Sequence, residues 1–123
     1  MTRGLLGALA ALLALFGASC GGAETGAVVH FLSQRQIPGQ AQSLEVAVLG
    51  AQDGKELSRR SYDLAPIARF PATLGLVQGD ETPARVRVEG KVLVGTAVVA
   101  AGSAEMEFAA ARLVRVDVSL IDQ

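Results

Sequence analysis

The chain has 123 residues, of which 11 are basic and 12 acidic, and its formal net charge at pH 7 is −1. A charge this close to neutral gives no support for nucleic acid binding, which normally uses a strongly basic face. The single histidine excludes sites that need two imidazoles, including most catalytic zinc sites. The single cysteine excludes an intramolecular disulfide and calls for another explanation in an exported chain.

The amino-terminal residues have the three parts of a secretory signal peptide. A basic residue, Arg3, precedes an apolar run over residues 5–16. A run of about a dozen residues is too short to span a membrane, which takes roughly 20 apolar residues. Three small residues follow the run and form the predicted cleavage site: Gly17, Ala18 and Ser19. We therefore predict that a helical signal peptide, residues 1–19, is removed during export.

Cys20 directly follows these small residues, and the segment GASC resembles the cleavage motif of a bacterial lipoprotein precursor. In that family the cysteine thiol takes up a diacylglycerol, and the new amino terminus is usually acylated by a fatty acid such as palmitate. The resemblance implies lipidation at Cys20 and a protein held to a membrane of the cell envelope. Gly17 departs from the family, which usually carries leucine or another larger apolar residue there. The alternative is plain secretion with a free thiol.

Residues 20–26 contain the cysteine and the small-residue segment GGAETG, which predicts a flexible tether. The remaining residues, 27–123, are enough for one small domain with one core. Short runs of β-forming residues alternate along this domain with turn signals such as Pro38-Gly39 and Asp53-Gly54. The runs predict seven strands, over residues 28–32, 44–48, 57–64, 70–76, 84–92, 104–108 and 114–120.

Two of these strands are predicted to lie at sheet edges. The strand over residues 57–64 is unusually polar, and the strand over 70–76 contains Pro71, which cannot donate a hydrogen bond to a neighbouring strand. Such edges are places where another chain could add on.

The whole pattern predicts an all-β domain, a single antiparallel sandwich of about seven strands with one solvated face on each sheet. The domain is similar to the immunoglobulin-like or transthyretin-like sandwiches found as modules in exported bacterial proteins. Strand spacing and the segments FPATLGLVQGD and ARVRVEG carry this resemblance. It implies a fold and no particular function.

Catalytic motifs are missing from the sequence. No G-x-S-x-G elbow, phosphate-binding loop, dinucleotide fingerprint or Cys/His metal pattern occurs. His30 lies between Val29 and Phe31 in a predicted strand, so we assign it a structural role. We predict that the protein is not an enzyme and uses no cofactor.

Four carboxylates lie in or near predicted loops, at Asp53, Asp63, Asp80 and Glu81. Calcium takes six to eight oxygen ligands, but these residues lack the spacing of a calcium loop. We predict turn and solubility roles for them and no metal site.

Two groups of basic residues could contact anionic head groups or a carboxylate-bearing partner. They are the pair Arg59-Arg60 and the row Arg85, Arg87 and Lys91. For the row we favour a solvated sheet face that opposes Glu105 and Glu107 across a hairpin, since opposite charges across strands stabilise pairing by about 0.2–1 kcal/mol each.

These observations predict a non-catalytic binding or interaction module, anchored to a membrane through Cys20, with an envelope protein as partner and no nucleic acid. One alternative is a carrier of a small apolar ligand, which requires a cavity of about 300 Å³ or more. The other is a plainly secreted sandwich protein.

Overall fold

A computed structural model describes residues 25–123. The predicted signal peptide, the cleavage residues Gly17, Ala18 and Ser19, the lipidation site Cys20 and most of the tether lie outside the described residues. Within residues 25–123, no helix is both long enough and apolar enough to cross a bilayer.

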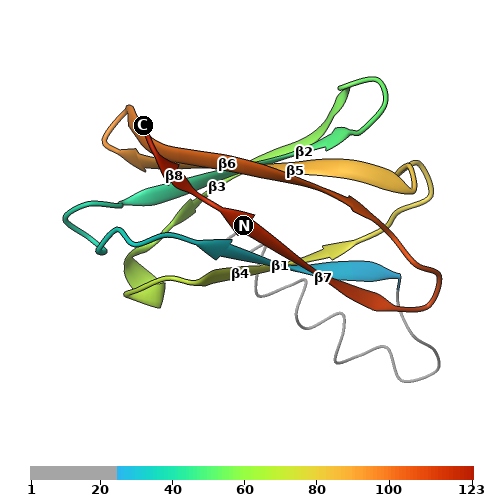
Figure 1. Cartoon of the computed structure of the whole chain (residues 1–123), viewed down its shortest axis with the longest axis horizontal. Coiled ribbons are helices and arrows are strands. Elements are labelled where there is room, and N and C mark those ends of the chain that lie inside the picture. The colour runs from blue at the N-terminus through green and yellow to red at the C-terminus, as the bar shows by residue number, and fades with distance from the viewer. Residues whose placement is uncertain (1–24) are drawn as a thin grey trace.

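The described chain forms two β-sheets, with one short 3-10 helix, η1 (Ala65–Ile67), between β3 and β4. One sheet has the strand order β4-β1-β7 and the other β3-β2-β5-β6-β8 (Figure 1). The strands are β1 (Gly26–Leu32), β2 (Ser43–Gly50), β3 (Glu56–Asp63), β4 (Ala72–Val77), β5 (Arg85–Val94), β6 (Ala97–Glu107), β7 (Leu113–Ser119) and β8 (Ile121–Asp122). The predicted all-β sandwich is confirmed.

The core lies between the sheets and contains alternate residues of strands such as β1, β5 and β7. Val86, Val88 and Val92 of β5 and Phe31 of β1 are all 0% exposed. Full burial of such side chains contributes about 1.5–3 kcal/mol each. Gly90 interrupts the row on β5, and a Cβ atom there would lie 2.8 Å from the Phe31 ring. The glycine therefore makes room for the largest side chain of the core.

The hairpin of β5 and β6 confirms the predicted charge pairing for Arg85 and Arg87, which both pair with Glu105, whereas Lys91 lies opposite Ala101. Its turn contains Gly95, whose φ of 62° lies in the left-handed region that glycine adopts without steric cost. A nitrogen of Arg85 lies 3.3 Å from a carboxylate oxygen of Glu105, and a nitrogen of Arg87 lies 3.9 Å from the other. The Arg85 and Glu105 side chains are 55% and 47% exposed, so this face is solvated as predicted.

The pairing of β1 with β7 differs from the prediction, because it is parallel, whereas we expected antiparallel pairs throughout. The chain reaches β7 from β6, which belongs to the opposite sheet. A crossing between sheets does not impose the reversal of direction that a hairpin imposes, and side-chain alternation carries no information on direction. After Ser119 the chain changes sheets again, and the short β8 pairs with β6.

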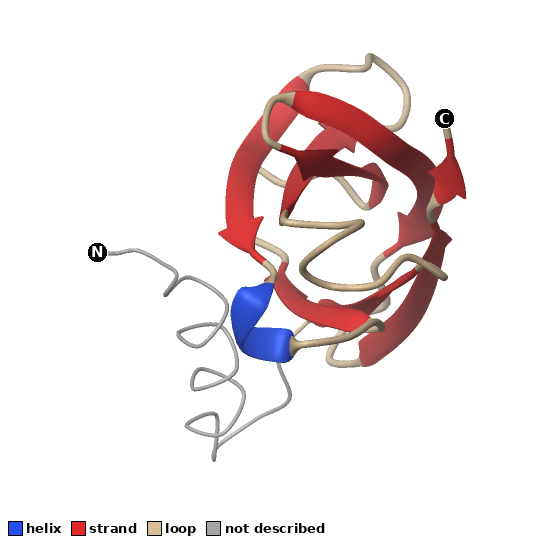
Figure 2. Cartoon of the chain, turned by 90° about the vertical axis from the view of Figure 1, so that its left-hand side faces the viewer, coloured by secondary structure: helices blue, strands red, loops and turns tan. Residues whose placement is uncertain are grey.

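The two long sides of the sandwich differ. On one side β6 passes close to the end of β7, where a Cβ atom at Gly102 would clash with the carbonyl oxygen of Ser119. On the other side β3 and β4 end their sheets, which confirms both predicted edges. The strand over 70–76 begins later than predicted, at Ala72, because Pro71 has no N–H to start the ladder. Figure 2 shows the two sheets curving around a common interior, with η1 at the rim.

Candidate functional site

The open side of the sandwich, between β3 and β4, contains an elongated groove. It consists of two cavities of about 410 Å³ and 290 Å³. Both are lined by Val46, Tyr62 and Leu74, so they adjoin one another. Volumes of this size lie at the lower end of the range of ligand pockets, about 300–1,000 Å³.

The groove exists because the inner face of β3 is polar. The register opposes three residues of β3 to three buried residues of β2: Ser58 to Val48, Arg60 to Val46, and Tyr62 to Leu44. Residues directly opposite one another in a ladder lie on the same face of the sheet. Ser58 and Arg60 therefore project toward the sandwich interior, where a closed sandwich would place apolar side chains. They do not seal β3 against β4, and the groove remains between the two strands.

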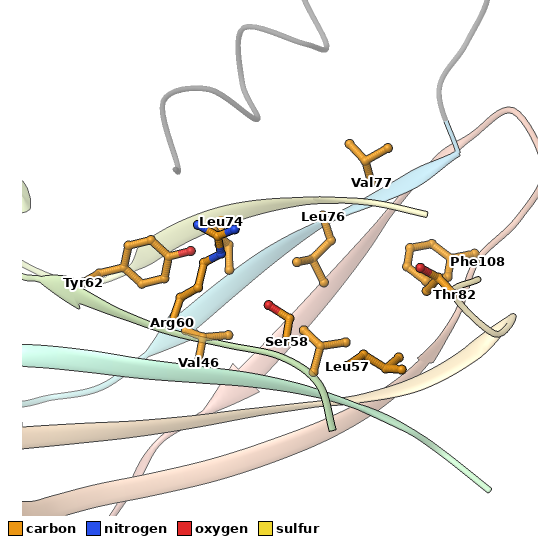
Figure 3. A pocket seen from close by; sticks show the side chains of 11 residues that line it. Val46, Leu57, Ser58, Arg60, Tyr62, Leu74, Leu76, Val77, Thr82 and Phe108 are labelled. Carbon is orange, nitrogen blue, oxygen red and sulfur yellow. The ribbon is translucent and has the colours of Figure 1, made fainter. Parts of the chain in front are cut away.

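The other wall and the floor of the larger cavity are apolar. Leu74 and Leu76 project from β4 toward β3, while Val46 lies below them on β2 (Figure 3). Leu74 is 4% exposed and Val46 is 3% exposed, so the groove reaches the core. Leu57 of β3 stands at the rim and is 38% exposed. An apolar ligand in this groove would cover Leu57, which otherwise faces water.

Arg60 is the one charged residue in the lining of the larger cavity, which includes no carboxylate. None of the ion pairs found within residues 25–123 involves Arg60. Its neighbour Arg59 lies on the outer face of β3, 2.7 Å from Glu56 and 2.9 Å from Glu45. The hydrogen bond from Arg59 to Glu56, with the attraction of both carboxylates, raises the pKa of Arg59 above its ordinary value.

Tyr62 lies beside Arg60, with its hydroxyl directed toward the arginine (Figure 3). Burial raises the pKa of the Tyr62 hydroxyl above its ordinary value, because a phenolate is poorly solvated there. The positive charge of Arg60 acts in the opposite direction and lowers that pKa. The two side chains therefore form one small polar group on an otherwise apolar surface.

The smaller cavity extends the groove toward η1. Its lining is mostly apolar and includes Phe31, Leu64 and Ile67. Asp63 also lies at this end, and its Oδ1 atom accepts a hydrogen bond of 3.0 Å from the backbone N–H of Ala65. This bond helps to begin the turn of η1 and uses part of the acceptor capacity of Asp63.

The other residues considered from the sequence lie away from the groove or have structural roles. His30 is half-buried on β1, with Nδ1 at 3.3 Å from Oγ1 of Thr73. Asp53 accepts a hydrogen bond of 3.0 Å from the backbone N–H of Lys55, and Asp80 and Glu81 are exposed. Within the described part of the chain, no group of three or more His, Cys, Asp or Glu side chains could hold a metal ion.

The sequence pointed to the edges but not to the groove. The sequence indicates Arg60 only together with Arg59, as a basic pair that could contact anionic head groups or a carboxylate-bearing partner. The sequence does contain an indication of the groove. Residues 58, 60 and 62 share one face of the predicted strand, so Arg60 lies on the same face as Tyr62. Only the register of β3 against β2 shows that this face points toward the interior of the sandwich.

No protein-family model and no curated protein sequence matches this chain. A crystal structure from Bacteroides thetaiotaomicron, described as "putative polysaccharide binding proteins (DUF1812)", has a similar fold with a TM-score of 0.56 and 11% sequence identity. The similarity covers 80% of this chain and 48% of that one. This chain therefore spans about half the length of that protein, and the likeness concerns the all-β fold.

Proposed function

We propose that the protein is a non-catalytic binding module of the cell envelope, held to a membrane through lipidated Cys20, and that it binds its ligand in the groove between β3 and β4. One observation carries the proposal: the inner face of β3 is left uncovered, so core side chains such as Val46 and Leu74 line an open groove. The similar fold of a protein described as polysaccharide-binding supports a binding role. The aliphatic walls suit an apolar ligand better than a sugar.

The start of the described chain lies beside this groove. The carbonyl oxygen of Thr25 accepts a hydrogen bond of 2.9 Å from the backbone N–H of Gln78, directly after β4. Cys20 precedes Thr25 by five positions, and a chain of that length reaches at most about 18 Å. An anchor at Cys20 would therefore keep the groove close to the membrane surface.

The binding site is tested by titrating the protein with the fluorescent apolar probe N-phenyl-1-naphthylamine. We expect the probe to bind the unmodified chain, and Leu76→Arg to abolish its binding by placing a second cation in the groove. Leu113→Arg is the matched control, because Leu113 is 50% exposed and does not line the groove. Equal probe binding by the Leu76→Arg variant and the unmodified chain would contradict the proposed site.

The anchor is tested separately, by the intact mass of the amino-terminal peptide from protein isolated with membranes. We expect cleavage before Cys20 together with the added mass of a diacylglyceryl group and a fatty acyl group. Cys20→Ala should move the protein to the soluble fraction. An unmodified thiol on soluble protein would favour plain secretion.

A protein partner in the envelope is a second candidate ligand. The six residues of β4, from Ala72 to Val77, carry no charge, and an uncharged open edge favours addition of a further strand. A photo-reactive residue in place of Val77 should then capture one reproducible partner.

A further inference from the structure

We infer that the groove binds an amphiphile with one anionic head group, whose apolar chain lies between Val46 and Leu76 and whose head is paired by Arg60. This inference rests on the proposed function, because it names the ligand class of the same site. The anion can be a carboxylate or a phosphate, since a guanidinium binds both in the same forked geometry.

The first argument is the charge of the groove. Arg60 is the one charged residue in the lining of the larger cavity, and a guanidinium keeps its charge in proteins. The hydroxyls of Ser58, Tyr62 and Thr82 share the lining and supply further hydrogen-bond donors. A cation with several donors on an apolar surface selects an anion and excludes cationic ligands.

The second argument is the contrast with Arg59. On the outer face of the sheet, Arg59 pairs with two carboxylates, from Glu45 of β2 and Glu56 of β3. On the inner face, Arg60 lies opposite Val46, which is apolar. The two neighbouring arginines of β3 therefore differ: Arg59 has carboxylate partners, and Arg60 is available to a ligand. Asp63 is the one acid in the lining of either cavity, but it lines the smaller one and accepts a hydrogen bond from the Ala65 N–H.

The third argument is the shape and lining of the larger cavity. It holds about 410 Å³, and its apolar residues include Val46, Leu57, Leu74, Leu76 and Phe108. The cavity is therefore a mainly apolar surface with one charged residue, Arg60. A single alkyl chain fits such a surface, and each methylene buried there should tighten binding about fourfold.

An inserted peptide strand fits the groove less well. A strand that fills the groove and pairs with both β3 and β4 needs both edges, and β3 carries three charged residues near its start, Glu56, Arg59 and Arg60. Charged residues on an edge strand are a common protection against added strands. The amphiphile requires no backbone pairing with β3, so these charges do not oppose it.

The test uses the full chain with Cys20→Ala, so that no attached lipid competes for the groove. Four ligands with the same alkyl chain are compared below their micelle-forming concentrations: dodecanoate, dodecyl phosphate, dodecanol and dodecyltrimethylammonium. Displacement of N-phenyl-1-naphthylamine gives each Kd. Fluorescence of Tyr62 is a second readout, since the sequence has one tyrosine and no tryptophan.

We expect at least one of the two anions to bind about fivefold to tenfold tighter than dodecanol, and the cation to bind more weakly than dodecanol. Arg60→Gln should weaken binding of the anion and remove its preference over dodecanol. Arg59→Gln is the matched control and should keep the preference. Thermal melting confirms that each variant is folded.

The outcomes separate this inference from the proposed function. The inference is wrong if dodecanol binds as tightly as both anions, or if Arg60→Gln keeps the preference for the anion. In either case, loss of probe binding in Leu76→Arg would still support the groove as the binding site. If none of the four ligands displaces the probe, and a partner strand does, the inference is also wrong. Preference for dodecanoate alone or for dodecyl phosphate alone supports it and identifies the head group.

Discussion

Arg59 and Arg60 are adjacent in the sequence and have opposite surroundings. Successive side chains of a strand point to opposite faces of its sheet, so Arg59 reaches Glu45 and Glu56 on the outer face. Arg60 projects over the apolar groove instead. A difference of one position thus separates a structural ion-pair group from a candidate ligand-binding residue.

The ionisation of Tyr62 gives a direct measure of this arrangement. The hydroxyl is the only phenol of the chain, so ultraviolet absorbance of the phenolate reports on it alone. Burial raises its pKa, and we expect a midpoint above the ordinary value of about 10. Arg60→Gln should move the midpoint higher, because the cation that lowers this pKa is removed.

The raised pKa of Tyr62 also determines how the stability of the fold changes with pH. The pKa of Tyr62 is higher in the folded chain than in the unfolded chain, so the contribution of neutral Tyr62 is complete below pH about 10 and is lost as the pH rises through the folded pKa. Arg59→Gln is the control and should leave the midpoint of Tyr62 in place. A lower midpoint in Arg60→Gln would contradict the placement of Arg60 beside the phenol.

At this scale the sequence predicts charge pairs better than it predicts the groove. The sequence predicts the pairing of Arg85 and Arg87 with Glu105, because strict alternation over residues 84–92 shows which side chains share the solvated face of the sheet. In β3 nearly every residue is exposed. The sequence therefore shows no contrast between a dry and a wet face, and the inward direction of Arg60 depends on pairing with β2.

Among the strands, β6 carries the sharpest steric constraint. A Cβ atom at Gly102 would clash with the backbone carbonyl of Ser119, where the chain passes from β7 to β8. Backbone cannot yield as a flexible side chain can, so we expect Gly102→Ala to destabilise the fold by about 1–3 kcal/mol. A loss of 1 kcal/mol lowers the melting temperature by about 4–8 °C in a domain of this size.

Gly39→Ala is the matched control for this prediction. A Cβ atom at Gly39 would meet no heavy atom within 4 Å, so its melting temperature should stay close to that of the unmodified chain. Equal melting temperatures for Gly102→Ala and Gly39→Ala would show that β6 and β7 are farther apart than the structure has them.

The strands themselves were largely predictable, whereas their partners were not. Alternation gave the position of β5 and β7, and a polar run and Pro71 indicated the two edges. The first half of β6, from Ala97 to Ser103, was missed because its small and apolar residues do not alternate with charges. The two-residue β8 is too short to give any pattern. Direction and sheet membership come from crossings between sheets, which local sequence does not encode.

For the whole molecule, the carboxyl-terminal strands make unequal contributions. β7 pairs with β1 along its length and buries Val116 and Val118, whereas both residues of β8 are exposed. A chain that ends after Phe108 should therefore show no cooperative thermal unfolding by circular dichroism. A chain that ends after Leu120 should unfold cooperatively. Cooperative melting of the shorter chain would refute the central role of β7.

The parallel pair of β1 and β7 also has a consequence for the order of events in the cell. Gly26 lies beside Leu113, so β1 gains its second neighbour only after β2 to β6 have been synthesised. Contacts between such distant segments form slowly, since a long loop must close before they are gained. A partial chain that ends before β7 leaves one edge of β1 unpaired. If the chain is exported to the cell envelope, as we propose, and crosses the membrane unfolded, this delay keeps the domain competent for transport until β7 has crossed.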